Sequence, residues 1–258
     1  MHRAEEPRAA NLPGITAVLA ANAGATELEG AVLDLAAVLD GLVAGNFEII
    51  VVDAAAEPPV ADLLAELGVR HPRLPVRLQG HPHPGLEPAL AASFDAAAYD
   101  LILVTGTNGE IDVRETNHLL EAIERGADLA VGYRPRRADG VVRRVYGWGW
   151  NVLVGLLFGW AGRDVDCPFK LFRTLVWQSV DIHPRAASRT FNAEFLVSAR
   201  RLGFEVAEIP VSHHRPRQGA PRRASRSQVA SWRFARSMRA APEEPRQSPE
   251  RRFLTPDP

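Results

Sequence analysis

Cysteine is almost missing from this chain, because Cys167 is the only one among 258 residues. A single cysteine cannot form an internal disulfide, which excludes a small secreted scaffold held together by disulfides. Apolar runs of about 18 residues, long enough to span a membrane, are missing as well. The nearest approach, 145–162, is interrupted by Asn151 and several glycines. The start of the chain lacks the basic-then-apolar pattern of a signal peptide, so we expect a cytoplasmic protein.

Lysine is just as scarce, since Lys170 is the only lysine among 30 basic residues. The net charge of -1 conceals two halves of opposite sign. Residues 1–132 carry 7 basic and 20 acidic side chains, whereas residues 133–258 carry 23 basic and 11 acidic ones. The basic half favours a phosphate-bearing ligand or an anionic surface as its partner. The alternative is that the two halves neutralise each other within one fold.

Buried strands alternate with amphipathic helices through the first half. The spacing predicts strands at 15–20, 47–53, 76–78, 100–105 and 128–132, and helices at 28–43, 59–67, 86–97 and 114–125. This alternation is typical of a mostly parallel α/β sheet that is covered on both faces. Ligands bind such sheets at the carboxyl ends of the strands, so the loops after Ala20, Asp53 and Thr105 are the candidate site.

The second half is predicted to add strands at 167–172 and 204–211, with a helix at 190–202 between them. Residues 1–13 are predicted to form a disordered lead-in to a domain that spans 14–219. Residues 220–258 are rich in Arg, Pro and Ser, and we expect this basic tail to be mostly disordered.

Five separated blocks of the chain resemble family-2 glycosyltransferases, in particular the dolichyl-phosphate mannose and polyprenyl-phosphate glucose synthases. The blocks are FEIIVVD (47–53), YDLILVTGTNG (99–109), LLEAIERGADLAVGYRPRRAD (119–139), DVDCPFKLFR (164–173) and FNAEFLVSARRLGFEVAEIPVSHHRPRQG (191–219). The resemblance implies a GT-A fold, an α/β domain with a mostly parallel central sheet flanked by helices. It also implies inverting transfer of a sugar from a nucleotide-diphosphate sugar to a polyprenyl-phosphate-like acceptor.

The resemblance places the nucleotide at Asp53, Gly106 and Asn108. Relatives carry Asp-x-Asp at the second of these places, where the carboxylates hold Mg or Mn against the diphosphate. This chain has Gly106-Thr107-Asn108 instead. Because hard divalent cations prefer carboxylate oxygens, the expected metal is doubtful here. Glu110 is a weak candidate for a remaining metal ligand, and the alternative is that Glu110 and Asp112 lie at a helix start.

The resemblance also assigns residues to the acceptor and to the phosphates. The carboxylates of Asp166 and Asp139 are the candidate catalytic groups, which either take a proton from the acceptor or orient it. Guanidinium groups bind phosphate oxygens in a bidentate manner, which suits a basic cluster in this region. The residues expected to bind phosphate or acceptor are Arg134, Arg137, Arg143, Arg144, Glu194, His213 and Arg215.

Two questions stay open at the level of sequence. The Trp-rich stretch at 145–160 is either an interfacial helix on a membrane surface or part of the acceptor-side core. The lost Asp-x-Asp leaves two functions, a glycosyltransferase or a catalytically impaired relative that acts as a binding or scaffold protein. A nucleic-acid partner is not favoured, because the basic tail has few interleaved aromatic residues.

Overall fold

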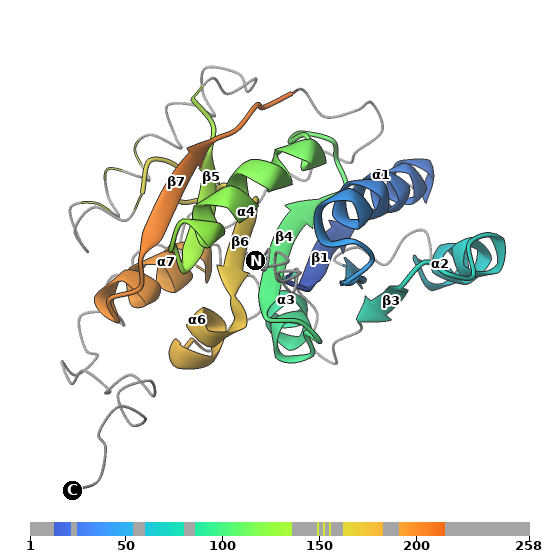
Figure 1. The fold of residues 1–258 in the computed structure, drawn as a ribbon, viewed down its shortest axis with the longest axis horizontal. Coiled ribbons are helices and arrows are strands. Elements are labelled where there is room, and N and C mark those ends of the chain that lie inside the picture. The colour runs from blue at the N-terminus through green and yellow to red at the C-terminus, as the bar shows by residue number, and fades with distance from the viewer. Residues whose placement is uncertain are drawn as a thin grey trace, which may run out of the picture.

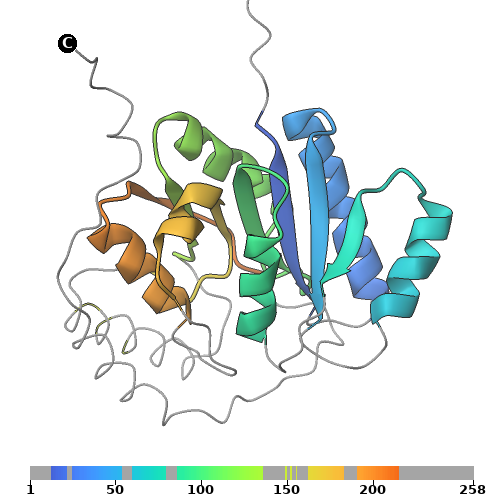
Figure 2. The ribbon, with the colours of Figure 1, turned by 90° about the horizontal axis from the view of Figure 1, so that it is seen from below.

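A computed structural model describes residues 13–21, 25–53, 60–79, 86–135, 149, 152, 155, 162–182 and 191–214. Within these residues one seven-stranded sheet has the order β3-β2-β1-β4-β6-β5-β7. The strands are β1 (Ile15–Ala21), β2 (Phe47–Asp53), β3 (Val76–Gln79), β4 (Leu101–Gly106), β5 (Leu129–Tyr133), β6 (Lys170–Arg173) and β7 (Val206–Pro210). The predicted mostly parallel α/β sheet is confirmed, and Figure 2 shows β4, β1, β2 and β3 side by side.

One strand runs against the others. β6 pairs antiparallel with both β4 and β5, while the pairs β1–β2, β1–β4, β2–β3 and β5–β7 are parallel. The strand predicted at 167–172 begins at Lys170 instead. It is preceded by a turn in which the Cys167 N–H donates to the Asp164 carbonyl. Through β6, the two halves of the chain share a single sheet.

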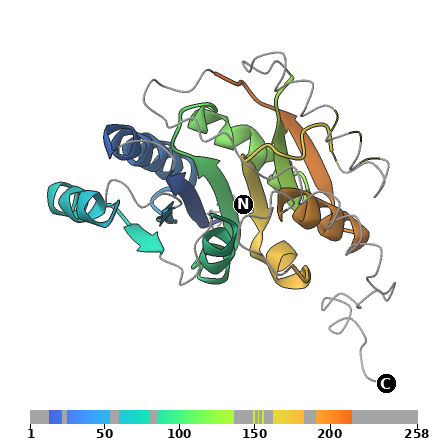
Figure 3. The same ribbon diagram turned by 180° about the vertical axis from the view of Figure 1, so that it is seen from behind.

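Helices cover both faces of this sheet. They are α1 (Ala25–Val43), α2 (Val60–Arg70), α3 (Leu86–Asp95), α4 (Thr116–Glu124), α6 (Thr174–Ser179) and α7 (Phe191–Arg201), with a short 3-10 helix, η1 (Val113–Glu115). Buried residues of α1, α2 and α4 pack against one face, and those of α3, α6 and α7 pack against the other. Figures 1 and 3 show this separation from opposite sides, with α1 and α4 across the sheet from α3, α6 and α7.

The strand pattern explains why both faces are covered. In β1 alternate residues enter different cores, Ala17 and Leu19 on the α1 face and Val18 on the α3 face, because side chains alternate along a strand. The predicted stop of the first helix is also confirmed. After α1 ends at Val43, Gly45 has a φ of +84°, a conformation that glycine adopts without steric cost.

Aromatic rings fill the core on the α3 face. The Phe94 ring lies 5.3 Å from that of Phe172 and 5.1 Å from that of Trp177, both edge to face. Phe172 also packs edge to face on Phe195 of α7, with centroids 4.9 Å apart. The indole N–H of Trp177 donates to the Asp95 carboxylate at 2.7 Å, so the ring is buried without losing its hydrogen bond. These contacts dock α3, α6 and α7 on the sheet.

None of the helices in the described part of the chain is long and apolar enough to cross a membrane. Most of the Trp-rich stretch and all of the tail beyond 214 lie outside the described residues, as do residues 1–12. The boundaries proposed for the lead-in, domain and tail therefore stay predictions.

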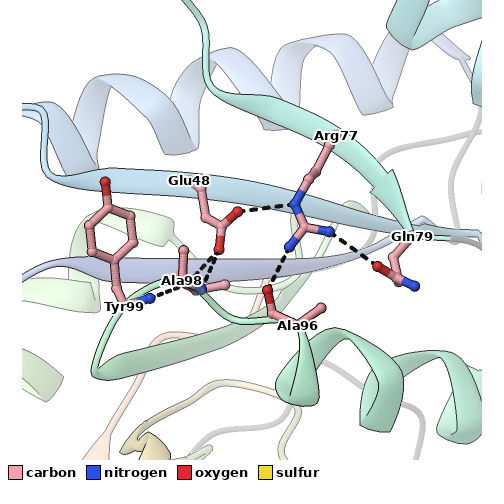
Figure 4. A network of polar contacts seen from close by, with 7 residues as sticks. Glu48, Arg77, Gln79, Ala96, Ala98 and Tyr99 are labelled. Atoms are coloured by element: carbon pink, nitrogen blue, oxygen red, sulfur yellow. Dashed lines mark hydrogen bonds and ion pairs between the residues drawn. The ribbon is translucent and has the colours of Figure 1, made fainter.

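Near the amino ends of β1 and β2, a partly buried carboxylate joins three parts of the chain (Figure 4). Glu48 accepts hydrogen bonds from the Thr16 hydroxyl at 2.9 Å, the Ala98 N–H at 2.8 Å and the Arg77 guanidinium at 3.1 Å. Arg77 in turn donates to the Ala96 carbonyl at 2.8 Å. Burial alone would raise the pKa of Glu48, but these three donors outweigh it and hold the pKa below its ordinary value.

Glu48→Gln is expected to lower the free energy of unfolding by about 1–3 kcal/mol, because one amide oxygen replaces two charged acceptor oxygens. Since the pKa of Glu48 is lowered in the folded state, its contribution is present above the ordinary value of 4.5 and is lost at more acidic pH. The difference in the free energy of unfolding between wild type and variant should therefore become smaller as the pH falls. Urea unfolding at several pH values measures this.

Glu124→Gln is the matched control, because Glu124 is exposed on α4. Glu124→Gln should leave the urea concentration at the midpoint of unfolding almost unchanged at every pH. Equal losses for Glu48→Gln and Glu124→Gln would contradict the assigned role of Glu48.

Candidate functional site

The carboxyl ends of β2, β1 and β4 lie side by side. In the strand register Ala21 pairs with Asp53, and Ala20 pairs with Gly106. Asp53 and Gly106 therefore lie at the same edge of the sheet, separated by β1, as the sequence predicts. The Thr107 N–H donates to the Ala20 carbonyl at 3.3 Å, which extends the β4 contact one residue beyond the strand.

The loop after β4 is held by its own side chains. The Asn108 Oδ1 accepts the Glu110 N–H at 3.3 Å, and the Asp112 carboxylate accepts the Arg114 N–H at 3.0 Å at the start of η1. Asp112 therefore caps a helix, which is one of the two roles that the sequence left open for it. The Glu110 side chain has a different role.

Glu110 contacts the segment that follows β7. Its carbonyl accepts the His214 N–H at 2.8 Å, and its Oε2 lies 3.8 Å from the His213 Nε2. The two side chains are almost enclosed, with 17% of Glu110 and 2% of His213 exposed. The structure thus brings His213, from the end of the described chain, to the loop where relatives carry their metal motif.

A second acid completes this junction. Both carboxylate oxygens of Glu115 accept the Ser212 N–H at 3.0 Å, and the Val211 N–H donates to the Tyr133 carbonyl at 2.9 Å. Sequence reasoning missed Glu115, because no local pattern marks a side chain whose partner is a backbone amide 97 residues away. We call the loop 107–115 together with the segment 211–214 the strand-end junction.

The donor set at this junction does not fit a divalent cation held as in Asp-x-Asp enzymes. Gly106 has no side chain, and Asn108 offers only a neutral amide oxygen, which also accepts the Glu110 N–H. Among the described residues, no group of three or more His, Cys, Asp or Glu side chains is arranged to hold a metal ion. Of the three carboxylates in this loop, Asp112 and Glu115 accept main-chain N–H groups, and Glu110 lies nearest in sequence to the Asp-x-Asp position.

A second polar group lies between β5 and β6. The Arg134 guanidinium binds Asp164 through two parallel hydrogen bonds, Nε to Oδ2 at 2.6 Å and Nη2 to Oδ1 at 2.9 Å. Only 6% of each side chain is exposed. A buried pair of this geometry fixes the loop before β6 against the end of β5. The fork of Arg134, which the sequence assigns to phosphate, thus holds a carboxylate of the chain itself.

Lys170 belongs to the same region. It is buried, and its ammonium donates to the Cys167 carbonyl and to the Asn192 Oδ1, the latter at 3.1 Å. Burial lowers the pKa of Lys170, although Asp164 and Asp166 nearby favour its charge, and burial raises the pKa of the Cys167 thiol. These contacts give Lys170 a structural role, because its ammonium joins the turn before β6 to α7.

The two polar groups approach each other around Gly132. A Cβ built on Gly132 would lie 3.2 Å from the Phe169 carbonyl and from a Val211 methyl group, and 3.3 Å from the Cys167 Sγ. The absence of a side chain here lets β5, the turn before β6 and the strand-end junction pack closely.

The remaining candidates divide into two sets. Asp166 is exposed on the turn before β6, and Glu194 is half-buried in the first turn of α7. Asp139, Arg137, Arg143, Arg144 and Arg215 lie outside the described residues, so their proximity to the site stays a prediction.

Asp164→Asn is expected to lower the free energy of unfolding by about 3–5 kcal/mol, because it leaves the Arg134 guanidinium buried without its counter-charge. Chemical denaturation measures the loss. Glu121→Gln breaks an exposed pair with Arg125 and is the control, with an expected change of about 0.5 kcal/mol or less. Equally small losses in the free energy of unfolding for both variants would contradict a stabilising role for the buried Arg134–Asp164 pair.

Comparisons with known proteins agree with this architecture, although no family model matches the chain. The chain is 32% identical over 222 residues to the glycosyltransferase AglD of Haloferax volcanii, a match that covers 80% of this chain but 34% of that protein. It is 26% identical over 203 residues to the polyprenol monophosphomannose synthase of Mycolicibacterium smegmatis, covering 71% and 75% of the two chains. The chain therefore spans about a third of the archaeal relative.

A solved structure shows the same fold. The glucosyl-3-phosphoglycerate synthase of Mycobacterium tuberculosis, in complex with Mn2+, UDP and glucosyl-3-phosphoglycerate, superposes with a TM-score of 0.63. The match covers 87% of this chain and 76% of that one at 16% identity. The sheet described above is thus a GT-A fold, as the sequence predicts.

Proposed function

We propose that this chain is a family-2-like glycosyltransferase, which transfers a sugar from a nucleotide-diphosphate sugar to a polyprenyl-phosphate-like acceptor. The observation that carries the proposal is the shared edge of β2, β1 and β4, with Asp53 and Gly106 on either side of β1. In open α/β sheets this edge is where ligands bind.

The nucleotide lies, in this proposal, along the edge formed by Asp53, Gly106 and Asn108. Asp53 contacts the base or ribose. The loop after β4 faces the diphosphate, and its close approach is helped by Gly106, which has no side chain at the end of the strand.

The acceptor lies on the side of β5 and β6. Asp166, with Asp139, orients the acceptor or takes its proton, and Glu194 supports the same region. The basic residues Arg137, Arg143, Arg144 and Arg215 bind the phosphates of donor and acceptor. Arg134 contributes by holding the loop that carries Asp166, through its bond to Asp164.

The reaction is a single displacement. An oxygen of the acceptor phosphate attacks the anomeric carbon, the bond from that carbon to the diphosphate breaks, and the nucleoside diphosphate leaves with the electron pair. Configuration at the anomeric carbon is inverted. A phosphate acceptor is already anionic, so the chain needs to position it rather than deprotonate it.

A lipid-phosphate acceptor requires the enzyme to act at a membrane surface. We propose peripheral contact through the arginine-rich segment after β5, whose guanidinium groups suit anionic headgroups. The cytoplasmic location expected from the sequence is compatible with this contact. A divalent cation, Mg2+ or Mn2+, is what the family would use, and the similar M. tuberculosis synthase was solved with Mn2+ and UDP.

Transfer of labelled glucose or mannose from UDP-glucose or GDP-mannose to a short polyprenyl phosphate tests the proposal, with Mn2+ and Mg2+ present. A labelled lipid product is expected. Asp166→Asn should lower kcat by about 100-fold, because the acceptor loses the carboxylate that positions it for attack.

Asp62→Asn on the exposed surface of α2 is the control and should leave the rate unchanged. Full activity of Asp166→Asn would move the catalytic role elsewhere. No labelled lipid from either donor, with the fold intact, is the result expected of a binding or scaffold protein.

A further inference from the structure

We propose that the strand-end junction binds the diphosphate of its nucleotide without a divalent cation, because contacts within the protein take the place of the metal. This inference rests on the proposed function, since it assumes a nucleotide at the edge of β2, β1 and β4. It concerns how that nucleotide is held.

The first step is the donor set after β4. A cation such as Mg2+ or Mn2+ is bound through carboxylate oxygens, with waters and phosphate oxygens filling the other positions. Gly106 supplies no oxygen from a side chain, and Asn108 offers a neutral amide oxygen that also accepts the Glu110 N–H at 3.3 Å. A neutral oxygen binds a hard divalent cation more weakly than the carboxylate that an Asp would supply.

The second step is the remaining carboxylate. Glu110 Oε2 lies 3.8 Å from the His213 Nε2, and both side chains are largely enclosed. A cation bound at Glu110 would have to enter this contact and leave most of its hydration shell, with one carboxylate and one imidazole nitrogen in return. That exchange is unfavourable for a hard divalent ion, which prefers a shell of oxygen ligands.

The third step is mechanical. A metal ion can bridge two segments that are distant in sequence, here the loop after β4 and the residues after β7. In this chain the two segments are joined by hydrogen bonds, from the Ser212 N–H to Glu115 and from the His214 N–H to the Glu110 carbonyl. The chain's own residues therefore hold the two segments together.

The charge of a diphosphate must still be balanced. The second half of the chain supplies the balance, since residues 133–258 carry 23 basic and 11 acidic side chains. Guanidinium groups bind phosphate oxygens in pairs, and they stay charged at any physiological pH.

Calorimetric titration of the full chain with UDP, GDP, ADP, CDP and dTDP in turn tests the inference. Each titration is run in EDTA and again with Mn2+. For the nucleotide that binds, the two dissociation constants should agree within about twofold. Because arginines hold the phosphates, affinity should fall as salt is raised in both buffers.

Affinity that rises about tenfold or more with Mn2+ would overturn the inference and leave the proposed function standing. No binding of any nucleotide in either buffer would overturn the proposed function, and the inference with it. The two failures are therefore distinguishable.

The double variant Gly106→Asp with Asn108→Asp restores both carboxylates and should make nucleotide binding tighter in Mn2+ than in EDTA. Asn46→Asp, the same exchange at an exposed residue before the amino end of β2, adds a charge at the opposite end of the strands and should remain insensitive to Mn2+. A metal response from Asn46→Asp equal to that of the double variant would contradict a specific loss of the metal site.

Discussion

Strand β6 is the constraint on which both halves of the molecule depend. Leu171 pairs with Leu103 of β4 and with Ala130 of β5, so a single strand joins β1, β2, β3 and β4 to β5 and β7. A shift of one residue would turn Lys170 and Phe172 toward the opposite face. The buried bonds of Lys170 and of Arg134 with Asp164 hold this register at the end where Asp166 lies.

The two groups of polar residues differ in what holds them. Arg134 and Asp164 form a charged pair through two parallel hydrogen bonds. The pair is shielded from water, so its stability depends on good hydrogen-bond geometry. The strand-end junction relies instead on main-chain amides that donate to Glu110 and Glu115 or to their neighbours. The Arg134–Asp164 pair therefore fixes the loop before β6 against the end of β5, whereas the strand-end junction fixes the course of two loops. A nucleotide bound at the carboxyl ends of the strands would contact the strand-end junction.

Local patterns in the sequence predict most of the fold, since β1, β2 and β4 are short β-branched or apolar runs that end in loops. They also place Asp53 and Gly106 at one edge, because parallel strands end together. They do not predict where β6 inserts, because strand order depends on pairing between Leu171 and residues 41 or more positions away. Nor do they reveal Glu115 or the Asp164 partner of Arg134, whose roles exist only once the chain has folded.

The bond between Glu115 and Ser212 closes a loop of 97 residues. During synthesis, β1, β2, β3 and β4 can pair before the rest of the chain is made, because all four strands lie within residues 15–106. The loop after β4 reaches its final hydrogen bonds only when residues 211–214 arrive. A partly made chain therefore has most of its sheet but an unfinished strand-end junction, and any ligand that needs this junction would bind only after β7 has docked.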